Sequence, residues 1–183
     1  MSASTHHDTV VEILNKKLVP GDQFRLRVTS RSMMPLLEPN DFILVETCTQ
    51  NQIHRGDLIT IRRHNDIVTH RLVNIGQNTV LTKGDHSPLP DAPVKSKDVL
   101  GRVNKIERGT FSLNLRSPKW TISNRLLGAV GWLEMILFRI VSKIIPSIYN
   151  PGNKFIKGLT RLFVAPFRIM NWVIVKSMSQ LQD

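Results

Sequence analysis

The spacing of apolar residues changes along this chain, and that change constrains the fold more than any other feature. From residue 23 to residue 115 the chain contains short runs in which apolar and polar residues alternate, as in 24–29. A period of two is typical of strands that are buried on one side only. Turn residues separate these runs. Further strands are predicted at 42–46, 57–62, 67–75, 78–82, 99–107 and 111–115.

Helical spacing flanks this strand-rich region on both sides. A short helix is predicted over 8–18, and two longer ones over 125–145 and 154–176. Many short strands in sequence favour an antiparallel sheet that curls on itself. We therefore expect an α+β fold: a mainly antiparallel, curled β-sheet with a short N-terminal helix and two C-terminal amphipathic helices. The predicted division is an N-terminal helix and lead-in at 1–22, a β domain at 23–118 and a basic helical tail at 119–183.

The positive charge is concentrated in the tail. The whole chain has a formal net charge of +11. Residues 119–183 hold nine basic residues against Glu134 and Asp183, which leaves the other 118 residues at only +4. The single cysteine excludes an internal disulfide framework, and His54, His64 and His86 show no ligand spacing with a cysteine or an acid pair. Neither a metal nor another cofactor is therefore expected.

The tail residues predict a surface for a membrane or a partner protein. Around each helix the basic residues fall on one stripe, and apolar residues such as Leu126, Leu133 and Ile140 fall on the other side. This pattern favours helices that lie in an anionic membrane interface, with docking onto a partner protein as the alternative. Glu134 falls within the apolar side, where nothing in the sequence explains it. The predicted membrane-binding residues are Arg125, Arg139, Lys143, Lys154, Lys157, Arg161, Arg168 and Lys176.

The expected location follows from the same pattern. The N-terminus lacks the basic segment and apolar run of a secretory signal peptide. The most apolar stretch of the tail, 126–148, contains three charged residues, so a simple spanning helix is disfavoured. We expect a peripheral or monotopic protein on the cytoplasmic face of a membrane.

Three stretches hold residues suited to nucleophilic catalysis. Ser32 directly follows a predicted strand, which would hold its hydroxyl in a narrow geometry. His70 lies on another predicted strand and would act as the general base. Asp85 and Asp91 offer carboxylates to orient the imidazole. By spacing alone, these are one serine, one histidine and two acids among many.

The order of the motifs adds to this picture. The segments 30–35 (Ser-Arg-Ser-Met-Met-Pro), 40–45, 55–59, 69–73 (Thr-His-Arg-Leu-Val), 82–85 (Thr-Lys-Gly-Asp) and 99–103 follow one another in the order found in signal peptidases. Over residues 24–106 the chain resembles the signal peptidase family. It is most similar to the histidine-using branch, of the endoplasmic-reticulum and archaeal type, because the bacterial branch has a lysine where His70 stands.

This resemblance implies a serine endopeptidase that cleaves a leader or precursor peptide. It implies Ser32 as the nucleophile, His70 as the general base and Asp91 as the orienting acid, with Asp85 as the alternative. The backbone N–H of Ser32 and the hydroxyl of Ser30 would stabilise the oxyanion. Family members carry an N-terminal membrane anchor, and here a basic C-terminal tail stands in its place. A dedicated maturation or accessory peptidase is therefore expected.

A second class of function stays open at this point. The chain could be a non-catalytic protein that keeps the peptidase fold and binds DNA or a partner. Nucleic acid is disfavoured because the basic helices carry broad apolar faces, and no helix-turn-helix pattern precedes the strands.

Overall fold

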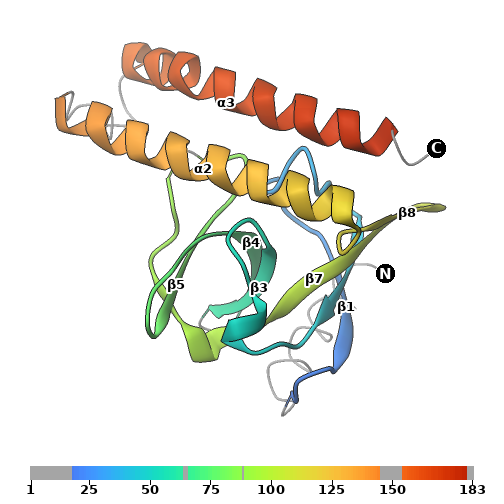
Figure 1. The fold of residues 1–183 in the computed structure, drawn as a ribbon. Coiled ribbons are helices and arrows are strands. Elements are labelled where there is room, and N and C mark those ends of the chain that lie inside the picture. The colour runs from blue at the N-terminus through green and yellow to red at the C-terminus, as the bar shows by residue number, and fades with distance from the viewer. Residues whose placement is uncertain (1–17, 64–65, 88, 145–153, 181–183) are drawn as a thin grey trace.

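An eight-stranded sheet forms the body of the protein, and two long helices lie together along one side of it (Figure 1). The computed structural model describes residues 18–63, 66–87, 89–144 and 154–180. The helix predicted over 8–18 lies outside these residues except for Leu18. All strand pairs are antiparallel, and the sheet curls, so the predicted α+β class is confirmed.

The strands follow the alternating runs of the sequence closely. Their order across the sheet is β1-β2-β7-β3-β4-β5-β6, and β8 pairs with β7. Two short 3-10 helices, Gln50–Gln52 and Ser96–Asp98, join strands. The strands are β1 (Gln23–Arg27), β2 (Phe42–Glu46), β3 (Leu58–Arg63), β4 (Asp66–Ile75), β5 (Thr79–Lys83), β6 (Val94–Lys95), β7 (Val99–Arg108) and β8 (Phe111–Asn114).

Two apolar clusters hold the curled sheet together. The larger joins β1, β2 and β7 to the loop after β1, and includes Leu26, Val45 and Leu37. The smaller lies on β3, β4 and β5 around Ile59 and Leu72. Register shifts between β2 and β7, β3 and β7, and β4 and β5 bend the sheet between these clusters.

The two helices are α2 (Pro118–Ile144) and α3 (Lys154–Gln180), in the regions where the sequence predicts helices. α2 approaches the body closely at two glycines. A Cβ atom on Gly56 would lie 2.3 Å from the carbonyl oxygen of Asn124, and one on Gly128 would lie 2.6 Å from the Cα of Gly56. Neither glycine can therefore be replaced without moving the helix. Within the described residues, no helix has the length and apolar character needed to cross a bilayer.

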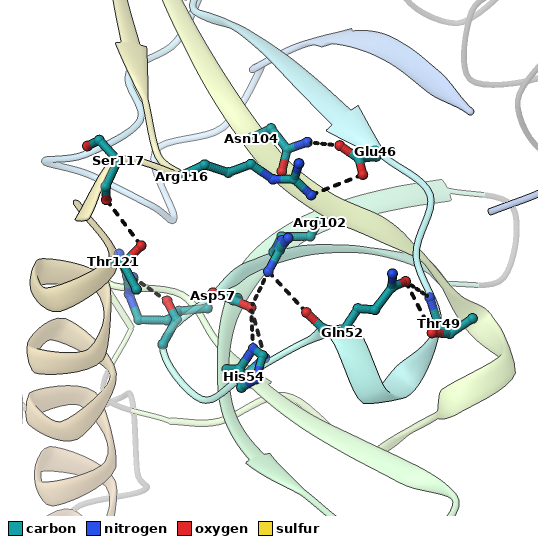
Figure 2. A network of polar contacts seen from close by, with 12 residues as sticks. Glu46, Thr49, Gln52, His54, Asp57, Arg102, Asn104, Arg116, Ser117 and Thr121 are labelled. Atoms are coloured by element: carbon teal, nitrogen blue, oxygen red, sulfur yellow. Dashed lines mark hydrogen bonds and ion pairs between the residues drawn. The ribbon is translucent and has the colours of Figure 1, made fainter. Parts of the chain in front are cut away.

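A polar network fixes the start of α2 to the sheet (Figure 2). Arg116, just before the helix, donates to the carboxylate of Glu46 on β2 at 3.0 Å, and Asn104 on β7 contacts the same carboxylate. Thr121 donates to the carbonyl oxygen of Ser117 at 3.1 Å within the first turn. The residue before it, Trp120, is completely buried in the larger apolar cluster. The predicted boundary at 118/119 is therefore crossed by both polar and apolar contacts.

The side of α2 that faces the body differs from the apolar stripe seen in the sequence. Leu126, Leu133 and Ile140 are exposed. The buried side instead combines Trp120, Leu127, Met135 and Phe138 with Ser123, Asn124, Glu134 and Ser142. Asn124 and Glu134 face inward because they meet the charged side chains of Arg71 and Lys83 on the sheet.

Candidate active site

Ser32 lies in the loop between β1 and β2, and the loop is held firmly on both sides. Met33 is 2% exposed and packs in the larger cluster. The N–H of His86 donates to the carbonyl oxygen of Ser32 at 2.9 Å. Gly84 lies so close that a Cβ there would be 2.8 Å from the same oxygen and 3.4 Å from the ring of His70. These contacts fix the serine backbone, as a nucleophile requires.

His70 stands in the middle of β4 between Ser32 and Asp91. Its Nε2 atom is 3.0 Å from the Ser32 hydroxyl oxygen, and its Nδ1 atom is 2.6 Å from Oδ2 of Asp91. The histidine is 9% exposed. Three residues that are far apart in the sequence are thus joined in one chain of hydrogen bonds, in the order serine, histidine, aspartate.

The carboxylate of Asp91 has two further partners that the sequence did not point to. Thr82 donates to Oδ2 at 2.6 Å, and Arg63 donates to Oδ1 at 3.3 Å. Burial acts to raise the pKa of the Asp91 carboxyl, but hydrogen bonds from His70 and Thr82 outweigh it and hold the pKa below its usual range. The group therefore stays ionised beside the imidazole. Thr82 belongs to the Thr-Lys-Gly-Asp motif, and that motif is the sequence signal that could have identified it as a residue of the site.

Asp85, the alternative acid, is engaged elsewhere. Both of its oxygens accept from the guanidinium of Arg71, each at 2.7 Å, and both residues are buried. Arg71 also donates to the carbonyl of Gly56 at 2.7 Å and to Asn124 of α2 at 3.1 Å. Asp85 therefore holds Arg71, the loop before β3 and α2 together.

Side chains on the two faces of β4 and β5 contact different parts of the protein. Successive side chains of a strand point to opposite faces, and cross-strand partners share a face. His70 and Thr82 serve the Ser32 side, whereas Arg71 and Lys83, which are paired across the two strands, point toward α2.

This arrangement explains why an acidic residue, Glu134, stands among apolar residues of the helix, which the sequence alone did not explain. Its carboxylate accepts from Lys83 at 2.5 Å, and both side chains are 2% exposed. Burial raises the pKa of the Glu134 carboxyl above its usual range, while Lys83 acts to lower it. A buried ion pair thus ties α2 to the residue that precedes Gly84 in the site.

A cleft of about 340 Å³ opens beside the Ser32 hydroxyl. The Ser30 hydroxyl oxygen lies 3.1 Å from that of Ser32 at its edge. The walls come from the end of β1, the loop after it, the start of β2, the end of β3 and the first half of β4. Apolar side chains among them are Leu26, Val28, Met33, Leu37, Ile43, Ile67 and Val68.

The basic residues predicted to bind a membrane fall into three groups. Arg125, Arg139, Lys143 and Lys176 are exposed. Arg168 is half-buried and donates to the carbonyl oxygen of His86 at 3.2 Å, so it contacts the body of the protein. The side chains of Lys154, Lys157 and Arg161 lie outside the described part of the chain.

Comparison with known proteins agrees with the fold. The model of the Peptidase S24-like family matches residues 2–103, which is more than half of the chain. No curated protein matches the sequence. The matched segment contains Ser30, Ser32, His70, Asp85 and Asp91, and it ends within β7. It identifies the family as a whole rather than one branch of it. This chain belongs to the Peptidase S24-like family.

Proposed function

We propose that the protein is a serine endopeptidase of the histidine-using signal peptidase type. Ser32 would be the nucleophile, His70 the general base and Asp91 the orienting acid. The observation that carries this proposal is the hydrogen-bond chain from the Ser32 hydroxyl through His70 to Asp91, with heavy-atom distances of 3.0 and 2.6 Å. Both distances lie within the range over which a proton is transferred or a ring is oriented.

The chemistry follows from these three groups. The Ser32 oxygen attacks the scissile carbonyl carbon as Nε2 of His70 takes the hydroxyl proton. Asp91 accepts a hydrogen bond from Nδ1–H and stabilises the imidazolium that forms. The imidazolium then gives its proton to the leaving amine, which breaks the peptide bond and leaves an ester on Ser32. Water, activated by the same histidine, hydrolyses that ester and restores the serine.

The tetrahedral intermediate needs donors for its oxyanion. The backbone N–H of Ser32 would be one donor and the Ser30 hydroxyl the other. The position of Ser30, with its hydroxyl oxygen 3.1 Å from that of Ser32, supports the second assignment. Both Ser30 and Ser32 line the cleft, where these donors would meet the substrate carbonyl.

The cleft supports an extended peptide as substrate. β1 is the terminal strand of the sheet order, and its end lines the cleft, so a substrate segment could pair along that edge. The cleft walls offer apolar contacts near Ser32 for one or two apolar side chains. We propose a leader or precursor peptide as the substrate and a dedicated maturation role for the enzyme.

Replacing Asp91 by Asn tests the proposal at its orienting acid. The amide can no longer fix the His70 tautomer or stabilise imidazolium, and the expected loss of the turnover rate is on the order of 10⁴-fold. Asp85→Asn removes a partner of Arg71 rather than of His70. Its rate per folded molecule should fall by less than about tenfold. Cleavage of a peptide library, followed by mass spectrometry, measures both rates.

The matched pair also separates catalysis from folding. Asp85→Asn is expected to lower stability because Arg71 is buried, so each rate is divided by the folded fraction found from tryptophan fluorescence. A fully active Asp91→Asn protein would contradict the proposed role of Asp91. Wild-type protein that is folded and cleaves nothing would favour the alternative of a partner-binding protein that keeps this fold.

A further inference from the structure

The exposed side of α2 carries two parallel stripes. One is apolar and includes Leu126, Leu133 and Ile140, which are 52%, 44% and 49% exposed. The other is basic and includes Arg139 and Lys143, both exposed, in line with Arg125 further back along the helix. Residues seven, fourteen or eighteen apart return to nearly the same direction on a helix. At about 1.5 Å per residue, the apolar stripe therefore continues for about 21 Å and the basic stripe for about 27 Å.

α3 carries a similar exposed side. Ile169, Trp172 and Val173 are 62%, 50% and 47% exposed. Lys176 lies over the Trp172 ring, with its nitrogen 4.5 Å from the ring centroid. Of the twelve large apolar residues that are exposed within the described part of the chain, nine lie on α2 and α3. We call these exposed sides of the two helices the outer faces.

The charge on the outer faces has one sign. Within the described parts of α2 and α3 the acidic residue is Glu134, and it is turned inward and paired with Lys83. The exposed charged residues of these parts are Lys119, Arg125, Arg139, Lys143 and Lys176. The outer faces are thus largely apolar, and the exposed charges on their described parts are all positive. Such a surface is complementary to one in which negatively charged groups cover an apolar layer.

We propose that the outer faces of α2 and α3 bind an anionic phospholipid surface. The apolar stripes would enter the layer between headgroups and acyl chains, and the basic stripe would meet the phosphates. Trp132 and Trp172, 42% and 50% exposed, would lie at headgroup level. Nucleic acid would satisfy the charge but leave the apolar stripes in water, so the observations favour lipid. This proposal stands independently of catalysis.

Flotation of the full chain with vesicles tests the proposal directly. We expect the protein to float with vesicles of phosphatidylglycerol and phosphatidylcholine, and to float only weakly with phosphatidylcholine alone. Salt should weaken the binding without abolishing it, because apolar burial is not screened. Arg139→Gln with Lys143→Gln should weaken binding about 25-fold, about fivefold for each charge removed.

Matched controls separate lipid binding from general electrostatics and from activity. Lys95→Gln with Lys97→Gln removes the same charge from exposed positions on the body of the protein and should leave binding unchanged. Ser32→Ala should also float as wild type does. Leu133→Ser with Ile140→Ser should remove the binding that survives in high salt. An equal loss in the two charge variants would overturn the proposal.

The three tryptophans report which part of the chain enters the lipid. Trp120 is fully buried in the core, whereas Trp132 and Trp172 lie on the outer faces. Lipids with brominated acyl chains should quench the tryptophan fluorescence of the wild type. They should quench the fluorescence of Trp132→Phe and of Trp172→Phe by a smaller fraction. The variant that carries both changes keeps only Trp120 and should not be quenched. A wild type that neither floats nor is quenched at low salt would overturn the proposal, as would a shift of nucleic acid with no flotation.

Discussion

Ser32→Ala and His70→Ala should each lower peptide cleavage by at least about 10⁴-fold, and the double variant should be no slower than either single variant. The two side chains act as one unit, since their reacting atoms are 3.0 Å apart and neither step proceeds without both. Residual cleavage would come from binding and oxyanion donors alone. The measurement is the initial rate on a peptide library at matched folded concentration.

Two exposed residues of the same types provide controls. Ser112→Ala on β8 and His54→Ala, whose ring lies near Asp57, should leave the rate unchanged. Cleavage that survives in Ser32→Ala at the wild-type rate would exclude Ser32 as the nucleophile. Losses that multiply in the double variant would mean that the two residues act in separate steps.

Glu134→Ala should lower the free energy of unfolding by about 3–5 kcal/mol, because it leaves the Lys83 ammonium buried without its partner. Replacing both residues together, as Lys83→Met with Glu134→Leu, removes both charges and should recover most of that loss. Urea unfolding followed by tryptophan fluorescence measures the difference, since Trp120, in the first turn of α2, lies in the core.

Glu107→Ala is the matched control for this pair. Its carboxylate accepts from Arg25 at 2.9 Å on the surface, where solvent weakens the interaction, so the change should cost less than about 1 kcal/mol. If Glu134→Ala were as mild as Glu107→Ala, α2 would not be anchored on β5 in solution. A double variant as unstable as Glu134→Ala would show that the ion pair is not the source of the loss.

Most of the sheet could be predicted from the sequence because each strand has its own local pattern. β2 occupies the predicted residues 42–46, since its alternation ends at turn residues on both sides. β6 was missed because it has two residues, Val94 and Lys95, and follows a proline-rich segment. A strand this short is defined by its pairing with β5 rather than by a pattern of its own.

The candidate site could be predicted in part. Ser32 and His70 were found through the motifs that surround them. Spacing could not separate Asp91 from Asp85, because both follow β5 within a few residues. The two acids differ in their tertiary partners: Asp85 pairs with Arg71, which leaves Asp91 to His70. Partners of this kind lie far apart in the sequence and leave no local signal.

The orientation of α2 shows where hydrophobic periodicity fails. Periodicity assumes that the face turned toward the protein is the more apolar one. Here the inward face must satisfy Arg71 and Lys83 of the sheet, so Asn124 and Glu134 are buried and Leu133 is exposed. Glu134 looked misplaced in the sequence because its partner, Lys83, is fifty-one residues away.

Covalent labelling of Ser32 tests the central claim most directly, because it requires no knowledge of the substrate. A fluorophosphonate probe reacts when a serine oxygen attacks phosphorus and displaces fluoride, which needs the same activation by a base as peptide cleavage. Mass spectrometry of the digested protein should find the adduct on the peptide that contains Ser32 in the wild type. Ser32→Ala should carry no adduct there, and His70→Ala should react far more slowly. A folded wild type without an adduct at Ser32, or one labelled equally fast in His70→Ala, would contradict the assignment of Ser32 and His70 as a catalytic pair.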